Sequence, residues 1–255
     1  MRKILRDREV QESFKHGEGF MGNSAGKSVD QHGFRVLGVQ PSSPAAQVGL
    51  VSFFDFIVAA NDVPLQTAAV EYFVTLIREF EDRPLPLRVY NCKNRSLREV
   101  TLVPSKNWPG EGRLGVAIRY DCYSGAEEAL CRILTVEPNS PAELAGLIPS
   151  SDYLLGTQEQ AFVDTDSLGK ELEKYVDKTV ELYVYNSDLD EVRVVVVMPS
   201  RSWGKKSGFD SPILGADVAS GFLHRLPEGC CHTTGSSTEI SLRPSLAAGL
   251  AEENA

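Results

Sequence analysis

The sequence predicts an α+β protein made of two tandem copies of one small domain. In the first copy "VQPSSPAAQVGL" occupies 39–50, and in the second "VEPNSPAELAGL" occupies 136–147, with seven of the twelve positions identical. "PSKNW", which ends at Trp108, returns as "PSRSW", which ends at Trp203. A period of about 95 residues is too long for a solenoid and matches a duplicated small domain. We therefore expect a half-open antiparallel sheet and two helices in each copy.

Each copy opens with a strand, which we expect at 33–40 and at 131–137. The repeated turn comes next and predicts a short helix. Ser43 and Ser140 have side chains that cap a helix N-terminus, and each is followed by proline, which is favoured at the first helical position. A glycine closes each turn, because glycine readily takes the left-handed conformation that ends a helix. The repeated motif therefore predicts one rigid turn in each domain.

A second strand is expected at 54–59 and at 151–156. An amphipathic helix follows in each copy, because apolar residues recur with the spacing of one helical face. The residues with this spacing are Val70, Phe73, Val74 and Ile77 in the first copy, and Leu168, Leu172, Tyr175 and Val176 in the second.

Two alternating strands then form a hairpin in each copy. Leu85, Leu87 and Val89 share one face, and the same alternation starts at Val180 in the second copy. A last strand is expected at 113–120 and at 213–219. The total is five strands and two helices per copy, which is typical of an α+β domain.

Composition excludes several classes of function. The net charge of −9 argues against nucleic-acid binding and against attachment to membranes through a polybasic patch. Five cysteines without a CxxC spacing indicate neither a disulfide framework nor a metal site, and favour a reducing compartment. No catalytic motif occurs in a fitting context, so we expect neither an enzyme nor a cofactor.

The order of these motifs resembles a known family. A strand, then S-P-A-x-x-x-G-L, then a strand opening with Asp55 or Asp152 is similar to a PDZ domain of the bacterial type. Two such units in tandem, each continuing through P-S-x-x-W to a short L-G strand, resemble the Golgi reassembly stacking proteins. The segment "GFLHRLP" at 221–227 fits the same pattern. The resemblance covers about residues 21–228 and implies permuted PDZ domains, in which the strand that forms the ligand groove comes last.

The resemblance places a peptide groove in each unit. An unpaired strand edge offers main-chain hydrogen bonds to an extended peptide, and a glycine lets the backbone approach closely. Free amides in such a turn can hold a carboxylate. The alternative for the apolar members is that they are simply core residues. The groove residues are Leu114, Gly115, Val116, Ala117, Ile118, Phe73 and Ile77 in the first unit, and Leu214, Gly215, Ala216, Asp217, Val218, Leu168 and Leu172 in the second.

The expected domains are a leader at 1–32, PDZ-like units at 33–120 and 121–227, and a disordered polar tail at 228–255. The leader contains "MGNSAGKS" from Met21, and family members carry a myristoyl group on the glycine after their initiator methionine. Gly22 is therefore an expected myristoylation site if Met21 is the true start, and otherwise belongs to a solvated leader.

A single myristoyl chain binds membranes only marginally, so a second attachment is needed. The resemblance implies that a golgin docked to the PDZ grooves supplies it. Cys230 and Cys231 in the tail are a second candidate, as palmitoylation sites, against the alternative of ordinary reduced thiols.

The resulting hypothesis is a non-enzymatic tether on the cytoplasmic face of the Golgi membrane. It binds the C-terminus of a coiled-coil golgin, and it binds a second copy of itself through the segment 221–227, with Phe222 and Leu223 as the contact residues. That segment is alternatively the last strand of the second unit. The competing function is a PDZ adapter of a protease or quality-control system that binds exposed C-termini.

Overall fold

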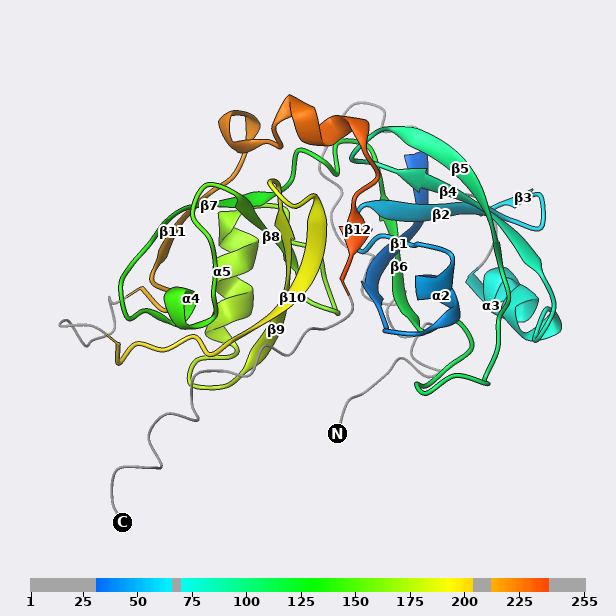
Figure 1. The fold of residues 1–255 in the computed structure, drawn as a ribbon, viewed down its shortest axis with the longest axis horizontal. Helices are drawn as coiled ribbons and strands as arrows, with labels where there is room; N and C mark the ends of the chain where they lie inside the picture. Colours follow the sequence, from blue (N-terminus) through cyan, green and yellow to red (C-terminus); the bar gives the residue numbers. More distant parts are fainter. Residues whose placement is uncertain (1–30, 66–69, 204–211, 239–255) are drawn as a thin grey trace, which may run out of the picture.

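The computed structural model describes residues 31–65, 70–203 and 212–238. The first unit holds one sheet with the strand order β5-β4-β2-β1-β6, and β3 pairs with β2 beside this path (Figure 1). Every pairing within it is antiparallel. The strands are β1 (His32–Val39), β2 (Asp55–Ala60), β3 (Val63–Pro64), β4 (Leu85–Asn91), β5 (Ser96–Leu102) and β6 (Val116–Cys122).

The second unit repeats this arrangement with the order β11-β7-β8-β9-β10-β12. Its pairings are antiparallel except the last, in which β12 runs parallel to β10. The predicted α+β fold with two tandem copies of one unit is confirmed, and in each copy the strand predicted to line the groove, β6 or β11, follows the helices and hairpin of its own unit. The strands are β7 (Cys131–Val136), β8 (Asp152–Gly156), β9 (Val180–Asn186), β10 (Glu191–Val197), β11 (Ala216–Ala219) and β12 (Ser236–Ser237).

The short helices α2 (Pro44–Gln47) and α4 (Pro141–Leu144) form as the Ser-Pro pairs predict. The Ser43 hydroxyl accepts a hydrogen bond from the Ala46 amide at 3.1 Å, and the Ser140 hydroxyl accepts one from the Glu143 amide at 3.2 Å. The closing glycines take the left-handed φ values of 67° and 73°. Both corners are therefore fixed by local chemistry.

The longer helices are α3 (Val70–Glu79) and α5 (Thr165–Glu173). The prediction that Tyr175 and Val176 continue α5 is wrong. The helix is capped at Lys174, and Asp177 then takes a left-handed φ of 58°. The Asp177 amide donates to the Pro199 carbonyl at 2.7 Å, and this tertiary contact is incompatible with continuing the helix.

A buried aspartate opens β2 and its counterpart β8. Asp55 is fully buried and accepts hydrogen bonds from Asn91 at 2.8 Å and from Arg98 at 2.8 Å. Asp152 repeats this with Asn186 at 2.7 Å and Arg193 at 3.0 Å. These aspartates tie each second strand to the neighbouring hairpin, so they are structural.

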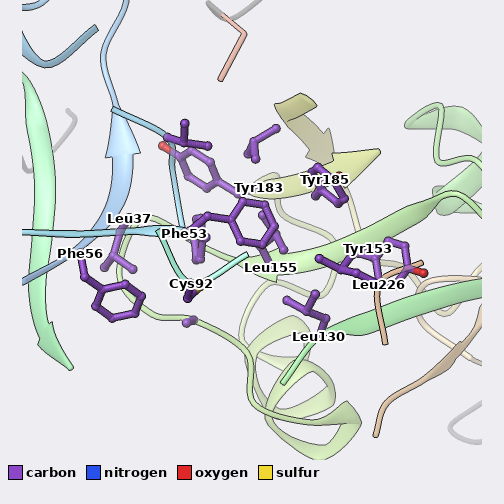
Figure 2. Packing of buried hydrophobic residues seen from close by; sticks show 14 of the residues in the cluster. Leu37, Phe53, Phe56, Cys92, Leu130, Tyr153, Leu155, Tyr183, Tyr185 and Leu226 are labelled. Carbon is purple, nitrogen blue, oxygen red and sulfur yellow. The ribbon is translucent and has the colours of Figure 1, made fainter. Parts of the chain in front are cut away.

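The two units share a third apolar core that lies between them. Each unit has its own core under α3 or α5. The shared core joins rings from both units. The ring centroids of Phe53 and Tyr183 lie 5.1 Å apart (Figure 2), and Phe54 meets Tyr185 edge-on with centroids 5.1 Å apart. The units therefore pack as one body.

The tail differs from its prediction. Residues 228–238 were expected to be disordered, but they form the 3-10 helix η3 (Glu228–His232) and β12. The physical reason is that Leu226 is buried in the shared core, and the polar groups that follow bond to Ser52 and Asn91 of the first unit and to Asp190 and Val192 of the second. The segment at 221–227 contains the 3-10 helix η2 (Phe222–His224) and no strand. The rest of the tail, 239–255, and the leader at 1–30 lie outside the described residues.

Candidate functional site

The predicted groove strands lie at the edges of the two sheets. β6 pairs with β1 from Val39 opposite Val116 to His32 opposite Cys122, and β11 pairs with β7. Within the part of the chain that the structure describes, no strand pairs with the other side of β6 or β11. Each edge can therefore accept an extended peptide as an additional strand.

A glycine loop at the start of β6 is shaped by its surroundings. Gly115 has a φ of 66°, and a Cβ atom at this position would lie 2.2 Å from the Ser43 Cβ and 2.8 Å from the Trp108 ring. The carbonyls of this loop are bonded to the segment from β1 to α2: that of Leu114 accepts from the Ala45 amide in α2 at 3.0 Å, and that of Gly115 from the Gln40 amide after β1 at 2.8 Å. Only glycine fits here, because both the backbone dihedral and the contact exclude a side chain.

The same loop leaves two donors available. Among residues 31–65, 70–203 and 212–238, the amides of Leu114 and Gly115 donate to no acceptor. Neighbouring free amides at a turn form a cradle for an anion such as a peptide carboxylate. Gly215 repeats the geometry with a φ of 71° and a carbonyl that accepts from Glu137 at 2.9 Å. Each unit therefore has a left-handed glycine loop beside an open strand edge.

At the first predicted groove, the partly exposed apolar side chains come from the strand more than from the helix. Val116 and Ile118 are half-buried and pack against the first unit's core, as does Ile77 on α3. Phe73 is only 1% exposed and Ala117 faces the shared core. The structure thus places Phe73 and Ala117 in the interior and leaves Val116, Ile118 and Ile77 partly exposed.

The second predicted groove has smaller apolar side chains along its strand. Ala216 and Val218 are half-buried on the side of α5, whereas Leu168 and Leu172 are buried at 4% and 2%. Asp217 points outward and accepts a hydrogen bond from the Thr135 hydroxyl at 2.6 Å. Residues 204–211, which precede this strand, lie outside the described residues. The two grooves therefore differ in side-chain volume.

The tryptophans of the P-S-x-x-W motif support the glycine loops, a role that the sequence analysis missed. Trp108 donates its indole N–H to the Gly112 carbonyl at 3.0 Å, and Trp203 donates to the Pro212 carbonyl at 2.7 Å. Their rings close the space in which a side chain at Gly115 or Gly215 would sit. The signal was present, because the motif recurs before both grooves.

The remaining predicted sites fall in different surroundings. Phe222 and Leu223 are 70% and 84% exposed. Cys230 and Cys231 are half-buried in η3, where the Cys230 thiol donates to the Ser187 carbonyl at 3.3 Å. Burial raises the pKa of the Cys231 thiol. Gly22 lies outside the described residues.

The described residues also bear on metal binding and on membrane crossing. Within the described ranges, no group of three or more His, Cys, Asp or Glu side chains is arranged to hold a metal ion. The same part of the chain contains no helix of the length and apolarity that crossing a membrane requires.

Comparison with known proteins identifies relatives over most of the chain. A family model described as the GRASP55/65 PDZ-like domain matches residues 8–121 and 87–229. Golgi reassembly-stacking protein 1 of Mus musculus is 36% identical over 207 residues, which is 81% of this chain and 45% of the relative.

Two other relatives cover similar stretches. The Homo sapiens protein of the same name is 37% identical over 195 residues, 76% of this chain and 43% of its own length. An uncharacterized protein of Schizosaccharomyces pombe is 30% identical over 201 residues, 79% of this chain and 55% of its own length. The chain thus spans about half the length of the curated relatives it matches.

Proposed function

The chain belongs to the GRASP55/65 PDZ-like domain family, and we propose that it is a non-enzymatic scaffold on the cytoplasmic face of Golgi membranes. The names of the mammalian relatives support a role in Golgi organisation. The observation that carries the proposal is the pair of open strand edges, each beginning at a glycine loop with free amides. This geometry suits the capture of protein C-termini.

The first groove is the proposed site for a golgin C-terminus. The peptide adds a strand along β6, and its carboxylate sits on the amides of Leu114 and Gly115. Its last side chain lies against Val116, Ile118 and Ile77, which are half-buried and apolar. Main-chain bonds then supply affinity, and the apolar wall selects the terminal residue.

Self-association uses the exposed segment after β11. Phe222 and Leu223 present their side chains to solvent at 70% and 84% exposure. A contact between this segment of one copy and a groove of the next is heterologous, so it can extend into arrays. Many weak contacts between two membranes then hold them together through effective concentration.

Membrane attachment is proposed to require two elements. A myristoyl group on Gly22 supplies weak binding, and a golgin held in the groove supplies the second attachment. Intact-mass measurement of the endogenous protein tests the first element: we expect a form that begins at Gly22 and carries a C14 acyl group. Finding only an unacylated form that begins at Met1 contradicts it.

The groove proposal is tested with Ile118→Arg and with the equivalent Val218→Arg in the second unit. Both side chains are half-buried beside their groove, so the arginine can reach solvent while it blocks the apolar wall. We expect Ile118→Arg to abolish the clustering of protein-coated beads and the capture of C-terminal peptides, with Val218→Arg retaining both. Unchanged clustering and capture with Ile118→Arg, in a protein that remains folded, contradicts the proposal.

A further inference from the structure

The tail segment Glu228–Thr238, here called the strap, lies between the two units (Figure 1). It begins after Leu226, whose side chain is buried in the shared core at 5% exposure. The 3-10 helix η3 then crosses the top of the molecule in the view of Figure 1, and β12 descends between β10 and the first unit. The strap is therefore in a position to bond to both units.

The backbone of the strap bonds to the second unit. The Ser236 amide donates to the Asp190 carbonyl at 3.1 Å, and the Thr238 amide donates to the Val192 carbonyl at 2.8 Å. These bonds extend the second sheet by one short parallel strand.

The other side of the strap bonds to the first unit. The Asn91 side-chain amide donates to the Thr234 carbonyl at 3.2 Å. The Ser52 backbone amide donates to the Ser237 hydroxyl at 2.9 Å. Thr234 and Ser237 of the strap are thus held by the first unit, while Ser236 and Thr238 are held by the second.

A fully buried lysine lies where the three parts meet. Lys93 comes from the turn between β4 and β5, and its side chain has no exposed surface. Its ammonium forms an ion pair with Asp190 of the second unit. It also donates to the Cys230 carbonyl and to the Thr233 hydroxyl of the strap, each at 3.0 Å. A buried charge requires such partners, so removing either the second unit or the strap leaves the Lys93 ammonium with an incomplete set of partners.

The strap has a glycine at the point where it passes the Lys93–Asp190 ion pair. Gly235 has a φ of 77°, and a Cβ atom there would lie 3.3 Å from an Asp190 carboxylate oxygen and 3.4 Å from the Lys93 ammonium. Burial raises the pKa of Asp190, but hydrogen bonds from Lys93, Thr233 and Tyr185 outweigh this effect and leave the pKa lowered. The carboxylate is thus held in the charged form that the lysine needs.

We propose that the strap is an intramolecular clamp, centred on Lys93, that locks the two PDZ-like units into one relative orientation. Its consequence is that the open edges of β6 and β11 point in fixed directions, so release of the strap frees one groove to turn relative to the other. The proposal is independent of what either groove binds. Its rival is that the aromatic shared core alone holds the units together.

Two cysteines provide a matched pair of reporters. Cys92 is 1% exposed and lies in the shared core (Figure 2), whereas Cys131 is fully buried inside the second unit's own core. Burial raises the pKa of both thiols to about 12. Both thiols are therefore protected from alkylation in the closed molecule, and separation of the units exposes Cys92 alone.

The first test is Lys93→Met in the full chain, with N-ethylmaleimide labelling of each cysteine followed by peptide mass spectrometry. The matched control is Arg88→Met on the adjoining strand β4. This change removes an exposed ion pair between Arg88 and Glu99. We expect Lys93→Met to raise the alkylation rate of Cys92 at least about tenfold, equivalent to ~1.4 kcal/mol of easier opening. The Cys131 rate and the control variant stay at wild-type values.

The second test acts on the strap without touching either core. Ser236→Pro removes the amide that bonds to Asp190, and Ser236→Ala, its control, keeps that amide. A rise in labelling at Cys92 but not Cys131 in Ser236→Pro supports the clamp, even if Lys93→Met exposes both thiols by unfolding. Wild-type labelling of Cys92 in Ser236→Pro, or an equal rise at both thiols in it, overturns the proposal.

Discussion

At the scale of single residues, the glycine loops restrict the choice of residue most strongly. Gly115 combines a left-handed φ of 66° with a neighbour, Ser43, 2.2 Å from the place of a Cβ. Gly115→Ala is expected to destabilise the protein by at least ~2 kcal/mol, because the dihedral and the contact are both unfavourable for alanine. Urea unfolding measures the change.

The control for this substitution is Gly169→Ala in α5. No atom lies within 4 Å of the place of its Cβ, and the residue is helical. Alanine is favoured over glycine inside a helix, so this variant is expected to gain up to about 1 kcal/mol. Equal effects of the two substitutions on the free energy of unfolding would contradict the account of the loop.

The buried aspartates also restrict the choice of residue at this scale. Asp55 is fully buried, and Arg98 compensates its charge with two hydrogen bonds. Arg98→Met is expected to cost about 3 kcal/mol of unfolding free energy, because it leaves a buried carboxylate with an incomplete set of partners. Thermal and urea unfolding check this, and a loss below ~1 kcal/mol, the range of a surface ion pair, would show that the pair is dispensable.

At the scale of elements, the capped helix α2 supports the groove directly. Ser43 both caps α2 and packs against Gly115. Ser43→Ala is expected to cost about 1 kcal/mol of unfolding free energy through loss of the cap. Ser140→Ala provides the equivalent change at α4. Chemical denaturation measures both, and no loss in either variant would show that the proline alone starts these helices.

Elements with local signals were the ones that sequence predicted well. The Ser-Pro start and the glycine stop fix α2 and α4 within a few residues, and their caps form as expected. The groove strands also form at the predicted edges. By contrast, apolar spacing placed Tyr175 in α5, although a bond from Asp177 to Pro199 ends the helix earlier. A contact between residues far apart in sequence has no local signal.

The tail shows the same limit more strongly. Its Ser- and Thr-rich composition is typical of disorder, and nothing in the segment itself indicates β12. Its order depends on Lys93, Asn91 and Asp190, which come from two hairpin turns in different units. The two hairpins are equivalent in the repeat, but Asp188 occupies in the second unit the position that Lys93 occupies in the first. The duplication therefore did not predict the buried charge.

At the scale of the whole molecule, the shared core predicts that the two units unfold together. Phe54 is 1% exposed and packs on Tyr185 across the interface. A buried apolar interface of this kind couples domains that would otherwise melt separately. Calorimetry of the wild-type protein is therefore expected to show a single transition.

Phe54→Ala tests whether that coupling resides in the shared core. The truncation is expected to cost about 3–5 kcal/mol and to split the calorimetric transition in two, because it opens a cavity at the interface. Phe73→Ala, in the first unit's own core, is the matched control. It should lower the transition temperature, since it truncates an equally buried ring, while both units still unfold together. A single transition in Phe54→Ala would show that the strap alone is enough to couple the units, and splitting in the control as well would show that the effect is not specific to the shared core.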